Sequence, residues 1–281
     1  AAGGAIPAVK SAHGFAGTQN AGVAFAGATS TTAKVATSFE YNGTAWSNAE
    51  DVNTTRDLCA GAGTQTAAIL FGGTLPPGGH STATEIYDGT DWATSPGSLN
   101  TARSRIGPLG TSTATLAVAG TPPATSSVES WNGTAWTEIA ELNTNRQQLG
   151  GGGISTLGIV FGGAEPTASA KTETWDGSSW TETTDLNTAR SGMGGSIGIQ
   201  TSTLAAGGST NRTELWNGST WTEQNDLTTD RTALAGTGTA ASSIVFGGDA
   251  GPGAEEQTEE WSFPSTPVVQ EGQLWIKTAT G

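Results

Sequence analysis

The sequence predicts an all-β protein, a β-propeller of six four-stranded blades, and a repeated motif is the main evidence. The motif reads Glu, any residue, Trp or Tyr, Asn or Asp, Gly, two further residues and Trp, and it returns along almost the whole chain. The first aromatic residues of its six copies stand at positions 41, 87, 131, 175, 216 and 261, in steps of 46, 44, 44, 41 and 45 residues. This spacing is typical of propeller blades.

Two further markers keep the same period. A pair of small residues follows an apolar run in each unit: Ala26-Gly27, Gly72-Gly73, Ala119-Gly120, Gly162-Gly163, Gly207-Gly208 and Gly247-Gly248. A single cation opens each unit: Lys10, Arg56, Arg103, Arg146, Arg190 and Arg231. We therefore expect one propeller domain over residues 1–263 and a C-terminal extension over residues 264–281 that leads to a further segment of a longer polypeptide.

Each unit divides into four strands, from the central axis outward. A glycine-rich stretch such as residues 58–66 suits the crowded axis, and the apolar run that follows it suits a strand covered on both faces. The third strand carries Glu-x-aromatic, and an Asn-Gly or Asp-Gly turn leads to the fourth, which begins at the second Trp. Strand parity places both aromatic residues on one face, so we expect them to be buried wedges between neighbouring blades: Trp131, Trp136, Trp175, Trp180, Trp216 and Trp221.

The last unit lacks part of this pattern. After Trp261 the sequence continues Ser262-Phe263-Pro264, with neither the turn nor the second Trp. An open ring would expose an unpaired strand edge. We therefore expect that pairing of the chain ends closes the ring, with residues 1–9 supplying the sixth outer strand. Residues 273–278 are the alternative donor.

The repeat resembles that of kelch β-propellers. The double glycines Gly72-Gly73 and Gly162-Gly163 after apolar strands, the Glu-x-aromatic strand and the following Trp carry this resemblance over roughly residues 8–263. Phrases such as Trp-Asn-Gly-Thr-Ala-Trp-Thr-Glu are similar to kelch arrays in structural proteins of marine bacteriophages. Residues 271–278 resemble a short segment found in phage fibre and appendage proteins.

That resemblance implies a non-enzymatic virion domain, part of a tail fibre, spike or capsid appendage, that binds a cell-surface glycan or protein. Its partners would be that receptor and other virion proteins, a homo-oligomer would be compatible with the role, and its location would be the virion, or otherwise outside the cell as a secreted protein. A kelch-type protein-interaction module, secreted or intracellular, is the first alternative. A glycan-active enzyme with a loop-borne site is the second.

Composition narrows the function classes. The net charge of −14 and the absence of a basic cluster argue against nucleic acid as a partner. No run of eighteen apolar residues suggests membrane insertion. The single cysteine excludes an internal disulfide bond and a thiolate metal cluster.

The residues with catalytic chemistry fall in repeat positions, so the sequence predicts no catalytic residue, metal site or cofactor. Cys59 and His13 each follow their unit's cation by three residues, a position that is apolar in the other units. Tyr41 and Tyr87 share one repeat position, which argues against a copper radical site of the galactose oxidase type. The repeated Glu and cation suggest structural ion pairs, and the first unit, which opens with Lys10, has Phe39 where the others have Glu.

The loops after the small pair differ most between units, and variable loops on a rigid scaffold commonly bind ligands. They span residues 28–36, 74–82, 121–127, 164–171, 209–212 and 249–257, and all should leave the same edge of the ring. The candidate binding residues in these loops are Thr74, His80, Thr121, Glu165, Lys171, Asn211, Arg212, Asp249 and Glu255.

Overall fold

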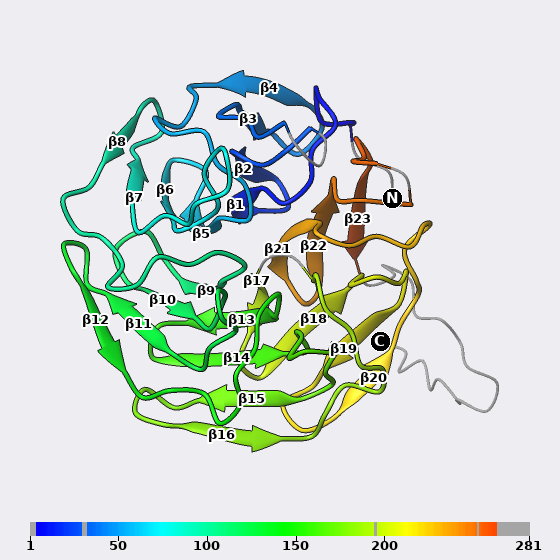
Figure 1. Cartoon of the computed structure of the whole chain (residues 1–281). Coiled ribbons are helices and arrows are strands. Elements are labelled where there is room, and N and C mark those ends of the chain that lie inside the picture. Colours follow the sequence, from blue (N-terminus) through cyan, green and yellow to red (C-terminus); the bar gives the residue numbers. More distant parts are fainter. Residues whose placement is uncertain (1–3, 30–32, 194–195, 252, 263–281) are drawn as a thin grey trace, which may run out of the picture.

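The computed structural model describes residues 4–29, 33–193, 196–251 and 253–262. Within these ranges the protein is all-β, with strands β1 to β23 and no helix. The strands follow one another in antiparallel units around a central axis, which gives a propeller-like arrangement (Figure 1).

The strands fall into four classes by their place in the unit. The innermost are β1 (Gly14–Thr18), β5 (Ala60–Thr64), β9 (Gly107–Gly110), β13 (Gly150–Ile154), β17 (Ser196–Ile199) and β21 (Ala235–Thr239). The second are β2 (Ala21–Phe25), β6 (Ala67–Phe71), β10 (Thr115–Val118), β14 (Leu157–Phe161), β18 (Ser202–Ala206) and β22 (Ser242–Phe246). The third are β3 (Ser38–Tyr41), β7 (Thr84–Tyr87), β11 (Val128–Trp131), β15 (Thr172–Trp175), β19 (Thr213–Trp216) and β23 (Thr258–Ser262). The outer strands are β4 (Trp46–Ala49), β8 (Trp92–Thr94), β12 (Trp136–Ile139), β16 (Trp180–Thr183) and β20 (Trp221–Glu223).

Within the described ranges the hydrogen-bonded sheets number four, not the six separate ones that the repeat predicts. Three are four-stranded, and the fourth joins β13 to β23 into an eleven-stranded sheet. Parallel bridges from β17 to β13 and to β21 connect its three parts. Glycine explains the close approach, because a Cβ added to Gly152 would lie 2.5 Å from Thr203 Oγ1 and 3.4 Å from the Gly198 carbonyl carbon.

The second strands form the core, as their apolar sequences predict. Ile69, Leu70 and Phe71 of β6 are fully buried, and so are Ile159 and Val160 of β14. The glycine pair that follows turns the chain in the left-handed region, with Gly162 at φ +62 and Gly163 at φ +96. A Cβ on Gly163 would lie 2.8 Å from the Gln147 carbonyl oxygen, so a side chain does not fit there.

The tryptophan pairs are wedges between neighbouring units, as predicted. All six predicted tryptophans are buried, with exposed fractions of 1 to 7%. Trp131 and Trp136 face each other across β11 and β12, with ring centroids 5.3 Å apart. Trp136 also packs on Phe71 of the preceding unit at 4.8 Å, and its Nε1 donates a hydrogen bond of 2.9 Å to Thr84 Oγ1.

A buried arginine–glutamate pair ties each unit together, except the first. Arg146 is fully buried; its Nη2 donates to Glu173 Oε1 at 2.6 Å, and its Nη1 donates to the carbonyl oxygens of Gly162 and Lys171 at 2.8 Å each. The second carboxylate oxygen of Glu173 accepts a hydrogen bond of 2.8 Å from the backbone N–H of Asn143. The same pair recurs as Arg56 with Glu85, Arg103 with Glu129, Arg190 with Glu214 and Arg231 with Glu259.

The first unit replaces both members of this pair together. Lys10 is fully buried, and its Nζ donates to the Thr37 carbonyl oxygen and lies 4.9 Å from the centre of the Phe39 ring. Burial lowers the pKa of Lys10 to about 7. The joint replacement confirms that the cation and the residue opposite it form one structural unit.

A circuit of six backbone hydrogen bonds surrounds the axis. It joins the six residues that lie two positions after each cation. The backbone N–H of each donates to the carbonyl oxygen of the equivalent residue in the preceding unit, at 2.6 to 3.1 Å. All six residues have a positive φ of 51 to 74°, and five are not glycine: Ala12, Leu58, Arg105, Gln148, Gly192 and Ala233. Such strained backbone persists only where the surrounding structure fixes it.

Of the N-terminal segment expected to supply the sixth outer strand, the structure describes residues 4–9, and residues 1–3 lie outside the described residues. Ile6 and Lys10 donate backbone hydrogen bonds to Glu256 and Glu255, just before β23, but residues 4–9 form no strand. In the described residues β23 pairs only with β22. Ile6 is the counterpart of Leu99 in another unit. Each lies four residues before the cation of its unit, and the backbone N–H of each donates to a carbonyl oxygen of the preceding unit. The alternative donor, residues 273–278, lies outside the described residues.

The wedge role of Trp136 gives a prediction on stability. Replacing it by Ala should reduce the free energy of unfolding by about 3 to 5 kcal/mol, because a large cavity would open between two units. Thr137→Ala, at the next and exposed position, should change it by less than about 0.5 kcal/mol. Denaturant unfolding of both variants checks this, and equal midpoints would contradict the wedge.

Candidate functional site

The loops after the small pair lie on one edge of the propeller, beside the backbone circuit. The residue after the small pair bridges to the residue after a cation, as in Asp57 with Thr74 and Ser104 with Thr121. Each loop therefore starts next to the residues that surround the axis. Arg105 Nη1 donates to Gln147 Oε1 at 3.3 Å on this edge, and Lys34 Nζ contacts Asp57 Oδ1 at 2.6 Å.

The structure distributes the candidate binding residues around this edge. Thr74 and His80 are brought together by a backbone bridge, and Asp249 and Glu255 share a single loop. Thr121 and Asp249 are held in bridges at the base of their loops. The remaining four, Glu165, Lys171, Asn211 and Arg212, lie in two other loops.

Two of the candidate cations have structural partners. Lys171 Nζ donates to Glu182 Oε1 at 2.7 Å, and Arg212 Nη1 contacts Glu223 Oε1 at 2.5 Å. These side chains are about half exposed, so the pairs contribute little to stability. The two cations remain accessible to an anionic group of a ligand. Asn211 is fixed through its backbone, because its backbone carbonyl oxygen accepts a hydrogen bond of 2.8 Å from the backbone N–H of Leu227.

A small cavity of about 90 Å³ lies at the axis, beneath the circuit. It is lined by the circuit residues and by the side chains three positions after each cation: His13, Cys59, Ile106, Leu149, Met193 and Leu234. Burial raises the pKa of Cys59 to about 11 and lowers the pKa of His13 to about 3. A neutral thiol and a neutral imidazole in an apolar cavity are packing groups, as the repeat position predicts. No group of three metal-binding side chains lies close together in the described ranges.

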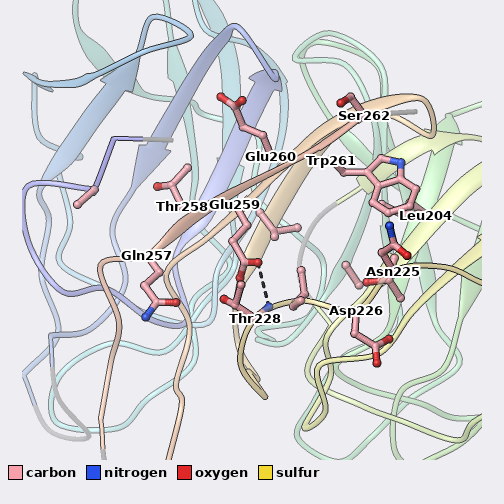
Figure 2. A pocket seen from close by; sticks show the side chains of 15 residues that line it. Leu204, Asn225, Asp226, Thr228, Gln257, Thr258, Glu259, Glu260, Trp261 and Ser262 are labelled. Carbon is pink, nitrogen blue, oxygen red and sulfur yellow. Dashed lines mark hydrogen bonds between the residues drawn. The ribbon is translucent and has the colours of Figure 1, made fainter. Parts of the chain in front are cut away.

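A larger groove of about 620 Å³ lies along the outer edge of β23 (Figure 2). Leu204, Ala206 and Thr213 of the preceding unit form one wall, and β23 forms the other. Trp261 points into the groove, whereas Glu260 points to the other side of β23 (Figure 2). Sequence reasoning identified the missing outer strand but not this groove, because the groove depends on how two units pack.

A scan against protein-family models finds no match, and no curated protein sequence is significantly similar to the chain. Among solved structures, the structure of YjhT is similar with a TM-score of 0.78 and 12% sequence identity, over 93% of this chain and 97% of that chain. At this identity the likeness shows the all-β propeller fold alone.

No helix of the described residues is long and apolar enough to span a membrane.

The burial of Cys59 predicts a slow thiol reaction. With a pKa of about 11, only about one thousandth of the thiol is ionised at pH 8, and the side chain is also shielded from reagents. We expect iodoacetamide to label Cys59 in the folded protein at least about a hundred times more slowly than in the denatured chain. Mass spectrometry of timed samples measures both rates, and similar rates would show that Cys59 is an accessible nucleophile.

Proposed function

We propose that the chain is a closed, six-bladed kelch-like propeller that serves as a non-enzymatic attachment domain of a virion appendage and binds a cell-surface glycan or protein. The six repeat units and the six-membered backbone circuit support the architecture. The resemblance to phage structural proteins supports the virion context. A tail fibre, a spike or a capsid appendage would display the loop edge towards a cell.

The main support for the binding role is the contrast between the uniform scaffold and the variable loops after the small pair. The buried glutamates Glu85, Glu129, Glu173 and Glu214 are each occupied by an arginine in the scaffold. The loops after the small pair, in contrast, differ in length and side chains although they share one edge. Polar groups that are exposed on a rigid frame can bind a ligand at a small cost in conformational entropy.

The charge of the loop edge suits a neutral or mixed-charge ligand. Lys171 and Arg212 each pair with a glutamate, and Lys34 pairs with Asp57, so cations and carboxylates alternate. A glycan presents many hydroxyl groups that such donors and acceptors could bind. A kelch-type interaction module for a protein partner, in a secreted or intracellular protein, is the alternative on the same surface. A glycan-active enzyme would require a loop-borne catalytic pair.

A loop exchange tests this proposal. Residues 74–82 are replaced by the sequence of the short loop, residues 209–212, and binding is measured on a glycan array and to intact cells. We expect affinity to fall at least about tenfold, or about 1.4 kcal/mol, with a thermal midpoint close to that of the parent. The matched control is Ile154→Ser with Leu157→Ser, which changes exposed side chains in the β13–β14 hairpin, away from these loops.

Two outcomes would contradict the proposal. Release of shortened glycans from bound ligands would show an enzyme instead of a binding domain. Equal binding by the loop exchange and the parent would show that the loop of residues 74–82 does not carry recognition, and the same exchange at residues 164–171 would then locate the binding loop or exclude the loop edge.

A further inference from the structure

The first and the last unit meet at one contact, which we call the seam and which joins residues 6–46 to residues 233–260. At the axis β1 lies beside β21 (Figure 1). The Ala12 N–H donates to the Ala233 carbonyl oxygen at 3.0 Å, and the Gly248 N–H donates to the Lys10 carbonyl oxygen at 2.9 Å. Neighbouring units elsewhere also follow each other in the chain, whereas in the described ranges these two are joined only through hydrogen bonds and packing.

Lys10 lies in the seam as a buried cation. It is fully buried, and within the described ranges it forms no ion pair with a carboxylate. Its Nζ donates to the Thr37 carbonyl oxygen and lies 4.9 Å from the centre of the Phe39 ring, which stands where the other units have a glutamate. From the last unit, Glu255 contacts Lys10 through its backbone carbonyl oxygen, 3.2 Å from the Lys10 nitrogen. An ammonium group buried without a counter-charge is costly.

The first unit also lacks the third member of the charge network. In the unit opened by Arg146, the backbone N–H three residues before the arginine belongs to Asn143 and donates to Glu173. The residue three positions before Lys10 is Pro7, which has no N–H. The seam therefore lacks both the carboxylate and the backbone donor that would bind it.

His13 is a second buried titratable group in the seam. Its side chain is 7% exposed, and neither ring nitrogen has a hydrogen-bond partner in the part of the chain that the structure describes. Its ring packs on Phe246 of the last unit, with centroids 5.1 Å apart. Leu149 and Leu234 take the same position in other units. The site thus accepts a neutral imidazole and offers nothing to stabilise an imidazolium.

The charges that face these two groups do not offset their burial. Asp51 and Cys59 act on Lys10, and Lys10 itself acts on His13. Asp51 already accepts the Ser38 N–H at 3.2 Å, and the Cys59 thiol, with a pKa of about 11, is neutral below pH 10. Burial therefore dominates and lowers the pKa of Lys10 from 10.5 to about 7 and that of His13 from 6.5 to about 3.

We propose that the seam is a pH-sensitive joint, which opens more readily as the pH falls because Lys10 and His13 bind protons once they reach water. The inference does not depend on which ligand the loop edge binds. Its consequence is a loss of fixed geometry between the loops of residues 28–36 and 249–257, which start on either side of the seam.

The direction of the effect follows from proton linkage. Both groups have a lower pKa in the folded protein than in water, so the open state binds more protons. The stability that neutral Lys10 gives the seam is complete above about pH 10.5 and is lost as the pH falls to about 7. The stability from neutral His13 is complete above about pH 6.5 and is lost as the pH falls to about 3.

Hydrogen exchange of the full chain at pH 8.5 and pH 5.5 tests the proposal. Rates are expressed as protection factors against the unfolded chain at the same pH, which removes the pH dependence of the exchange reaction itself. Protection of the Ala12 N–H should fall at least about tenfold more than that of the Gln148 N–H, which makes the equivalent bond to Arg105 at 3.1 Å between two inner units. Equal falls at the two sites, or no fall at either, would overturn the proposal.

Two substitutions assign the effect to its groups. Lys10→Met should abolish the fall in Ala12 protection between pH 9 and pH 7, and His13→Leu should abolish the fall between pH 6.5 and pH 4.5. Met193→Leu is the matched control, since it exchanges one apolar side chain for another at the position of His13 in the fifth unit and should retain both falls. Full pH dependence in both Lys10→Met and His13→Leu would contradict the assignment and overturn the proposal.

A restored charge network gives an independent check that does not rely on Lys10→Met folding. The triple variant Pro7→Asn, Lys10→Arg and Phe39→Glu gives the seam the arginine, the glutamate and the backbone donor of the other units. Because arginine stays charged over this range, Ala12 protection should change by less than about threefold between pH 9 and pH 7. A tenfold fall in this variant would show that other groups control the seam and would overturn the proposal.

Discussion

The buried arginine–glutamate pair is the interaction on which the rest of the scaffold depends. Each guanidinium donates hydrogen bonds to the small pair, to the start of the third strand and to the glutamate, and the glutamate accepts from the link to the preceding unit. Three segments of the chain, at residues 143–146, 162 and 171–173, thus meet at one charge pair. Two charges inside a protein are costly to desolvate, so their value lies in geometry: removal of either one would leave the other unpaired in an apolar surrounding.

The backbone circuit at the axis is the second constraint, and it follows from the first. The arginine fixes the chain at the start of each unit, and two residues later the backbone turns through a positive φ to donate to the preceding unit. Leu58 and Gln148 accept this conformation although they are not glycine. The strain is repeated around the axis and is balanced by hydrogen bonds that only this arrangement allows. The loops that start beside the circuit therefore have a rigid base.

Much of the fold could be predicted because the motif is local and repeated. The spacing of Trp131 and Trp136 determines their cross-strand register, and the joint absence of Arg and Glu in the first unit indicates their coupling. What the sequence could not show depends on the approach between units. No local signal predicts that Leu58 has a positive φ, that β13 and β17 join into one sheet, or that Thr213 lines an open groove. The position of Ile6 four residues before Lys10 was a signal for its linking role.

A double-mutant cycle at Arg146 and Glu173 measures how strongly the two buried charges are coupled. We expect Arg146→Met and Glu173→Leu each to reduce the free energy of unfolding by about 3 to 5 kcal/mol, because each leaves a buried charge unpaired. Together they should cost less than the sum of the single effects by at least about 2 kcal/mol, since the double variant buries no charge. Additive effects within about 0.5 kcal/mol, measured by denaturant unfolding, would contradict the claim that the pair acts as one structural unit.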